Sequence, residues 1–161
     1  MAEQSRAGWR IAVASDAAGA LHRQALTADL LASPLVREVI DLTPGQPPAY
    51  PVAAFAAAQL VADGRADRAL LVCHTGLGVA VAANKVTGVR AVTAHDAYSV
   101  EHAIRHTDAQ ILCLGQAIVP LETARALLRT WLALRFDPSG KATRKLALIT
   151  AYERSGRPDP A

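Results

Sequence analysis

A cysteine, a histidine, a threonine and two glycines directly follow an apolar run in the segment Cys73–Gly78 (CHTGLG). Gly76 and Gly78 let the chain turn with positive φ and approach a ligand closely. A helix starting after them would point free N–H groups and a partial positive charge at the loop, and such a nest stabilises an anion. The same field would favour the thiolate form of Cys73. The segment therefore predicts a thiolate base beside a site for a phosphate or a developing oxyanion.

A structural interpretation of these residues is also available. A cysteine that ends a buried strand is often only a small apolar side chain. The position beside Thr-Gly-Leu-Gly favours chemistry for Cys73, whereas Cys113 lies inside an apolar run and is expected to pack in the core. Cys73 and His74 are adjacent and their side chains diverge, so they do not have metal-ligand spacing. The glycines match neither a GxGxxG pattern nor a Walker motif.

Strand-like apolar runs alternate with longer helix-like runs along the chain. This alternation predicts right-handed βαβ crossovers and a parallel sheet covered on both faces. The expected strands are 10–15, 36–42, 68–73, 88–94 and 109–114, and the expected helices are 18–31, 51–62, one ending at 84, 98–105 and 121–134.

Ligands of such sheets bind outside the carboxyl ends of the strands. Asp16, Cys73–Gly78 and His95-Asp96 each follow an expected strand, so we expect them at one edge of the sheet. His106-Thr107-Asp108 precedes the last strand and falls near the opposite edge within one chain. His102 and His106 are one helical turn apart and could share a face. His22, on the first expected helix, is expected to be solvated.

The 161 residues suffice for one domain spanning 1–161, with flexible ends at 1–8 and 155–161. Two cysteines cannot build a disulfide framework, so a cytoplasmic location is expected. No apolar run is long enough to cross a bilayer, and the N-terminus does not look like a secretory signal. The net charge of +3 comes from scattered cations, which argues against nucleic acid as a partner and favours an anionic small molecule.

A basic cluster, Lys141-Ala142-Thr143-Arg144-Lys145, opens the C-terminal segment 136–151 and leads into a short apolar helix. This segment has no obvious place in its own domain. We expect it to reach a neighbouring subunit.

Three motifs together resemble the signature of ribose-5-phosphate isomerase B and the galactose-6-phosphate isomerase subunits. They are Val72–Gly78 (VCHTGLG), Ala82–Lys85 (AANK) and Gly88–Ala91 (GVRA), and the likeness extends from about residue 10 to 150. The resemblance implies an aldose–ketose isomerase of a sugar phosphate. It also implies a Rossmann-like α/β/α fold with a five-stranded parallel sheet, a homodimer or homotetramer with shared active sites, and no metal or organic cofactor.

The same resemblance assigns roles to residues. Cys73 would be the base that moves a proton between C1 and C2, and Thr75 would help hold the enediolate oxygens. His106 would assist ring opening from the partner subunit. A proton next to a carbonyl needs only a base and an oxyanion hole, so these roles are chemically consistent. The implied substrate-binding residues are Asp16, Tyr50, His74, Gly76, Leu77, Gly78, Asn84, Thr107, Lys141 and Lys145.

Departures from the family pattern are concentrated where the substrate phosphate is held. Ala17 stands in place of a histidine, Thr107 of an asparagine and Ala117 of an arginine, while Lys141 and Lys145 replace two arginines. A lysine is a point charge where an arginine offers a two-pronged fork. Each charged hydrogen bond is worth about 1.5–3 kcal/mol. The substrate is therefore predicted to differ from ribose 5-phosphate.

Two alternatives remain open at this point. The chain could be a non-catalytic family member that binds a sugar-like ligand or serves as a subunit of a hetero-oligomer. Nucleotide binding is the weaker alternative, because the sequence lacks GxGxxG after the first strand and an acidic residue placed for a ribose.

Overall fold

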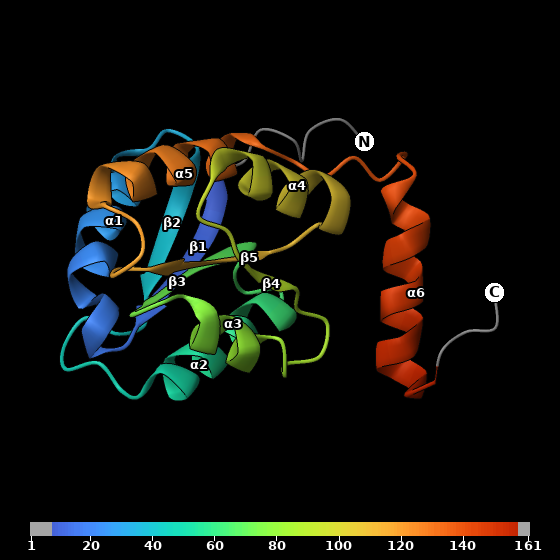
Figure 1. Cartoon of the computed structure of the whole chain (residues 1–161), viewed down its shortest axis with the longest axis horizontal. Helices are drawn as coiled ribbons and strands as arrows, with labels where there is room; N and C mark the ends of the chain where they lie inside the picture. The colour runs from blue at the N-terminus through green and yellow to red at the C-terminus, as the bar shows by residue number, and fades with distance from the viewer. Residues whose placement is uncertain (1–7, 158–161) are drawn as a thin grey trace.

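A single five-stranded parallel sheet forms the centre of the molecule in the computed structural model, which describes residues 8–157. Its strand order is β2-β1-β3-β5-β4 (Figure 1). Every neighbouring pair of strands is parallel, as predicted. The strands are β1 (Trp9–Ser15), β2 (Val36–Asp41), β3 (Arg68–Cys73), β4 (Ala91–Thr93) and β5 (Ile111–Gly115).

Helices cover both faces of this sheet (Figure 1). The helices α2 and α3 pack on one face, and α1, α4 and α5 pack on the other. The predicted three-layer α/β/α architecture is therefore confirmed. The helical elements are a 3₁₀ turn, η1 (Ala17–Gly19), then α1 (Ala20–Ala32), α2 (Tyr50–Ala62), α3 (Leu77–Ala83), α4 (Ala97–Thr107), α5 (Leu121–Ala133) and α6 (Ala142–Ser155).

The two faces are packed with different side chains. Small alanines of α2 and α3 lie against the sheet on one face, so these helices approach it closely. On the other face, leucine and isoleucine side chains surround Trp131, which is 1% exposed. A core with few aromatic rings is thus filled by aliphatic side chains on helices and strands.

Element bounds differ from the predicted ones where a turn or a cap intervenes. The strand expected at 88–94 is reduced to β4, because Gly88 turns with a φ of 84° before the ladder begins. The first helix starts as a 3₁₀ turn capped by Asp16. The C-terminal helix continues to Ser155, the first residue of the segment 155–161 that was predicted to be flexible. Residues 1–7 and 158–161 lie outside the described part of the chain.

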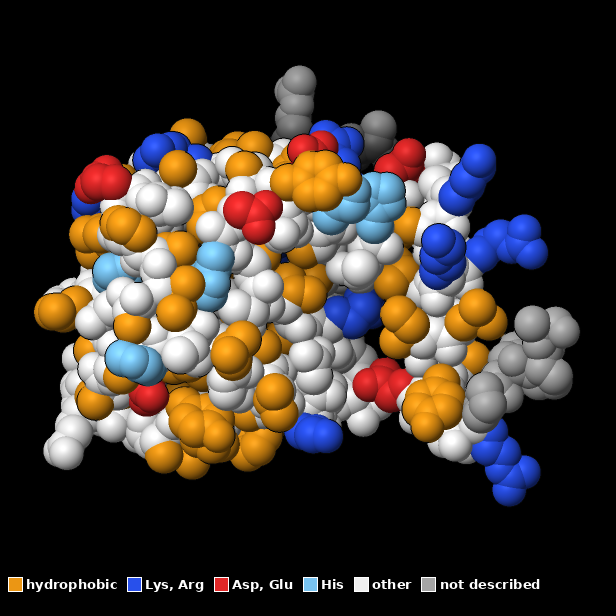
Figure 2. All heavy atoms as spheres, viewed as in Figure 1, with side chains coloured by type: hydrophobic (Ala, Val, Ile, Leu, Met, Phe, Trp, Pro, Cys, Tyr) orange, Lys and Arg blue, Asp and Glu red, His pale blue; other side chains and the backbone are white. Residues whose placement is uncertain are grey.

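The C-terminal helix α6 stands apart from the body of the molecule (Figure 1). It has no buried residue, and Leu148, Ile149 and Tyr152 are 52%, 55% and 54% exposed. Figure 2 shows hydrophobic and cationic side chains side by side on this helix. One tie to the body is the carboxylate of Glu153, which accepts a hydrogen bond from the N–H of Gly88 at 3.0 Å. No helix within residues 8–157 is both long and apolar enough to cross a membrane.

Candidate active site

The segments that follow β1, β3, β4 and β5 converge at the carboxyl edge of the sheet, as predicted. The N–H of Gln116 donates to the carbonyl of Cys73 at 2.9 Å, and the N–H of Ala117 to that of His74 at 3.0 Å. Gly19 packs on the end of β3 so closely that a Cβ there would lie 2.4 Å from the carbonyl oxygen of Val72. These contacts place Asp16 and the loop 73–78 in one site.

Cys73 is the last residue of β3 and is 5% exposed. Its Sγ atom accepts a hydrogen bond from the backbone N–H of Gly76 at 3.1 Å. This backbone donor fixes the position of the Cys73 sulfur against the loop.

The loop after β3 is locked against the end of β5. Gly76 has a φ of 78°, and a Cβ there would lie 2.9 Å from the carbonyl carbon of Leu114. The hydroxyl of Thr93 donates to the carbonyl of Gly76 at 2.6 Å. A Cβ on Gly115 would lie 2.5 Å from the carbonyl carbon of Thr75. The backbone of the loop is therefore held in one shape before any ligand arrives.

Tyr50 and Asp16 border the same loop. Tyr50 begins α2 after the proline-rich loop, and a Cβ on Gly78 would lie 2.8 Å from its ring atom Cε2. Asp16 caps the 3₁₀ turn through Oδ1, which accepts the N–H of Gly19 at 3.0 Å. Thr75 accepts the N–H of Leu77 on its hydroxyl at 3.3 Å, and the side chains of His74 and Leu77 are exposed.

His95 has a structural role that the sequence alone did not reveal. Its Nε2 accepts the N–H of Gly115 at 3.0 Å, so the ring proton of the neutral form lies on Nδ1. Burial lowers the pKa of His95, although the carboxylate of Asp96 acts in the opposite direction. The neutral ring thus anchors the end of β5, on which the loop rests. In the sequence, the position of His95 directly after the fourth expected strand was the only indication that this residue lies near the site.

His22, expected to be solvated, also makes a structural contact. Its Nε2 lies 2.8 Å from the carbonyl oxygen of Val119. Its backbone N–H donates to the side chain of Gln116 at 3.0 Å. The expectation was wrong because α1 lies against the turn that follows β5.

Asn84 lies at the end of α3 opposite to Gly76, and its amide is bound to backbone groups. Nδ2 donates to the carbonyls of Ala80 at 3.0 Å and Ala91 at 2.8 Å, and Oδ1 accepts the N–H of Ala91 at 2.8 Å. These bonds join α3 to β4. Asn84 is therefore a positioning residue in this structure, and its predicted contact with the substrate stays a prediction.

His106 and Thr107 lie near the opposite edge of the sheet, as the sequence predicted, and Lys141 lies beside His106 there. The helix α4 runs from the carboxyl edge towards the amino edge, and its 11 residues span roughly 16 Å. His106 and Lys141 line a cavity of about 360 Å³ there, together with Arg105, Arg135, Asp137, Gly140 and Ala142. The hydroxyl of Thr107 donates to the carbonyl of Ala103 at 2.6 Å, and Lys145 is exposed on α6.

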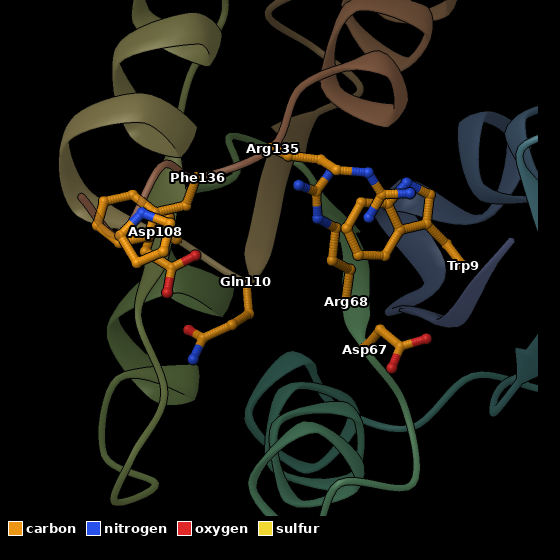
Figure 3. A pocket seen from close by; sticks show the side chains of 9 residues that line it. Trp9, Asp67, Arg68, Asp108, Gln110, Arg135 and Phe136 are labelled. Atoms are coloured by element: carbon orange, nitrogen blue, oxygen red, sulfur yellow. The ribbon is translucent and has the colours of Figure 1, made fainter. Parts of the chain in front are cut away.

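A second cavity of about 340 Å³ adjoins the start of β3 at the amino edge (Figure 3). Arg68 and Arg135 stack on the ring of Trp9 at 3.9 and 4.0 Å. Burial lowers the pKa of Arg68 to about 10. Its guanidinium donates to the carbonyls of Trp131 and Leu134, at the C-terminal end of α5.

The polar groups of this second cavity thus hold structural elements together. A cation is favourable at a helix C-terminus, which accounts for the buried Arg68. The two carboxylates of the cavity wall are paired, Asp67 with Arg10 at 2.7 Å and Asp108 with Arg90 at 3.0 Å.

Across residues 8–157, no three His, Cys, Asp or Glu side chains gather closely enough to hold a metal ion. The carboxyl edge of the sheet brings together side chains and backbone groups with chemistry of their own. They provide a buried thiol, a fixed loop with backbone donors, a hydroxyl and a carboxylate.

Known proteins resemble this chain in sequence and in fold. Residues 11–149 match the family described as Ribose/Galactose Isomerase. The chain is 50% identical over 147 residues to D-erythrulose-4-phosphate isomerase 2 of Mycolicibacterium smegmatis, covering 89% of this chain and 97% of that protein. It is 36% identical over 105 residues to ribose-5-phosphate isomerase B of Escherichia coli, covering 65% of this chain and 70% of that one.

A solved structure agrees over almost its whole length. Ribose-5-phosphate isomerase B of Clostridium thermocellum superimposes with a TM-score of 0.84 at 33% identity, covering 92% of this chain and 99% of that one. The match to the family extends across the cysteine loop and most of the C-terminal segment. The chain therefore belongs to the ribose/galactose isomerase family and is an isomerase of the aldose–ketose type.

Proposed function

We propose that this chain interconverts D-erythrulose 4-phosphate and the four-carbon aldose phosphate that is its isomer. The relative named for D-erythrulose 4-phosphate is 50% identical and is matched over nearly its whole length. The relative named for ribose 5-phosphate is 36% identical over a shorter stretch. The substitutions at Ala17 and Ala117, whose methyl groups cannot bind a phosphate, also favour a substrate other than ribose 5-phosphate.

Cys73 is the base in this reaction. Its thiolate takes a proton from C1 of the ketose, the C1–H bond breaks, and the electron pair moves into a C1–C2 enediolate. The thiol then returns the proton to C2, while the hydroxyl proton passes from O1 to O2. The observation that carries the proposal is the hydrogen bond from Gly76 N–H to Sγ, because it fixes the sulfur of Cys73 in a loop whose other backbone N–H groups can serve the enediolate oxygens.

The remaining predicted site residues divide between the two ends of the substrate. Asp16, Tyr50, His74, Thr75 and the backbone of Gly76–Gly78 serve the sugar end. Lys141 and Lys145 serve the phosphate end.

A homodimer, or a homotetramer built from it, completes the site. Within one chain, α4 separates His106 from the edge that holds Cys73. The exposed Leu148, Ile149 and Tyr152 give α6 an apolar surface that suits a second copy. Each copy then supplies the cysteine loop to one site and the end of α4 with Lys141 to the other. The reaction needs Cys73 as a free thiol, which suits the reducing cytoplasm.

Proton exchange tests the proposal. The protein is incubated in D₂O with D-erythrulose 4-phosphate, D-ribose 5-phosphate or D-galactose 6-phosphate, and deuterium at C1 and C2 is followed by NMR. We expect kcat/KM for D-erythrulose 4-phosphate to exceed that for ribose 5-phosphate about a hundredfold, since two charged hydrogen bonds to the pentose phosphate are lost. Equal values would contradict the substrate, and binding without exchange of any sugar would favour the non-catalytic alternative.

A further inference from the structure

We propose that His106 binds the substrate phosphate together with Lys141 and that this site opens no sugar ring. The inference rests on the proposed function, because it follows from the chemistry of a four-carbon 4-phosphate. It assigns phosphate binding to the cavity lined by His106 and Lys141, which lies at the amino edge of the sheet, away from Cys73 of the same chain.

D-erythrulose 4-phosphate has no cyclic form of ordinary size. Its O4 is esterified, so only O1 and O3 could attack the C2 carbonyl, and either would close a three-membered ring. In the aldose isomer, O2 or O3 attacking C1 would close a ring of three or four atoms. Both sugars are therefore acyclic, and ring opening is not a step of the reaction.

The atom numbering of the sugars points to a new task for His106. In the furanose of an aldopentose the ring oxygen is O4, so a histidine that assists ring opening must stand beside O4. In a four-carbon 4-phosphate, O4 is the ester oxygen that carries the phosphate. The same position therefore brings His106 against the phosphate.

The cavity around His106 has the charge that this task needs. Lys141 and Arg135 line it with His106, and within residues 8–157 neither cation has a carboxylate within ion-pair distance. Arg105 is held by Glu101 at 2.8 Å. The one acidic residue on the wall, Asp137, accepts hydrogen bonds from the N–H and hydroxyl of Ser139. A dianionic phosphate would find uncompensated positive charge here.

The surroundings of His106 do not suit a general acid that must be oriented for one proton transfer. Its ring stacks on that of His102 at 4.5 Å, and His102 stacks on Tyr98 at 4.0 Å. In the described part of the chain, no carboxylate or carbonyl accepts a hydrogen bond from the imidazole ring of His106. The neighbouring Thr107 turns its hydroxyl into its own helix. The ring of His106, stacked on His102 and surrounded by cations, can still donate a hydrogen bond to a phosphate oxygen.

Steady-state kinetics of His106→Gln with D-erythrulose 4-phosphate tests the inference. We expect KM to rise about ten- to a hundredfold, the value of one charged hydrogen bond, while kcat stays within about threefold. Inhibition by inorganic phosphate should weaken by the same factor as KM rises. His106→Lys, which places a cationic hydrogen-bond donor at this position, should recover most of the KM. The matched control is His102→Gln, one turn away on α4 and outside the cavity wall, with KM unchanged.

Each other outcome has a definite meaning. A fall in kcat of a hundredfold or more with unchanged KM would show that His106 takes part in the chemistry and would overturn the inference. Unchanged kcat, KM and phosphate inhibition would also overturn it, because His106 would then not touch the substrate. If the wild-type protein fails to turn over D-erythrulose 4-phosphate, the proposed function is wrong. Weaker inhibition or binding of inorganic phosphate in His106→Gln would then still report on the phosphate site.

Discussion

The backbone N–H of Gly76 donates a hydrogen bond to the Sγ atom of Cys73 across 3.1 Å. The donor exists in this place because Gly76 adopts a φ of 78°, and its conformation is fixed by contact with the end of β5. A residue with a side chain would meet both the backbone strain and the carbonyl of Leu114. The loop is thus built to keep a donor on the sulfur of Cys73.

Replacing Cys73, the proposed base, should abolish turnover without abolishing binding. Cys73→Ala is expected to lower kcat for D-erythrulose 4-phosphate by about a thousandfold or more, within the range of general-base catalysis. Binding of substrate, measured by calorimetry, should change little. The control is Cys113→Ala, which removes the other thiol, one whose pKa is raised by burial in β5. Persistence of proton exchange in Cys73→Ala would contradict the assignment of the base.

A pair of glycine variants separates backbone strain from the shape of the loop. Gly76 and Gly64 both have positive φ, 78° and 67°, but a Cβ on Gly64 would meet nothing within 4 Å. Both alanine variants should lose about 1–2 kcal/mol of unfolding free energy from the left-handed conformation. Gly76→Ala should lose more, because its Cβ collides with Leu114, and its kcat should fall at least tenfold. Equal stability and full activity in the two variants would show that the loop can relax.

The fold and the position of the site could be predicted from the sequence. The side chains that hold the site in place by hydrogen bonds to backbone groups could not. Apart from Arg68, the run 68–73 is apolar, and it ends at Cys73, so strand, loop and sheet edge followed from local pattern. His95 and Asn84 act on backbone groups of Gly115 and Ala91, and no spacing rule marks a side chain that binds a backbone atom of another element. The fourth strand was overestimated because its apolar pattern continues through the turn at Gly88.

Removing the side-chain amide of Asn84 should reduce the stability of the fold more than the affinity for substrate. Asn84→Ala deletes three hydrogen bonds to Ala80 and Ala91. At about 1 kcal/mol for each bond, the loss of unfolding free energy should be about 2–3 kcal/mol. Urea denaturation measures this loss, and KM for D-erythrulose 4-phosphate should remain within about twofold. A large rise in KM with little loss of stability would instead indicate that Asn84 contacts the substrate.

The pH dependence of stability should carry a signature of His95. Burial lowers its pKa below the ordinary value of 6.5, so the unfolded chain takes up a proton before the folded chain does. The stabilisation that comes from the neutral ring is therefore fully present above about pH 6.5, and the folded state loses it as the pH falls from about 7 towards 5. The urea midpoint of the wild type should decrease across this window. His95→Gln keeps an acceptor for the N–H of Gly115 but cannot titrate, so its midpoint should decrease less. Identical slopes would exclude His95 as the titrating group.

Charge on the free face of α6 should break the proposed dimer and leave the subunit folded. Ile149→Glu and Tyr152→Glu alter side chains that are 55% and 54% exposed in one chain, so neither disturbs its core. A carboxylate placed in an apolar interface costs several kcal/mol, which is enough to dissociate a moderate dimer. Sedimentation should show monomers with unchanged circular dichroism, and kcat/KM should fall because each site lacks the partner's His106 and Lys141. Leu31→Glu, on the exposed face of α1, is the control and should remain dimeric and active. Full activity in a demonstrated monomer would mean that one chain holds a complete site.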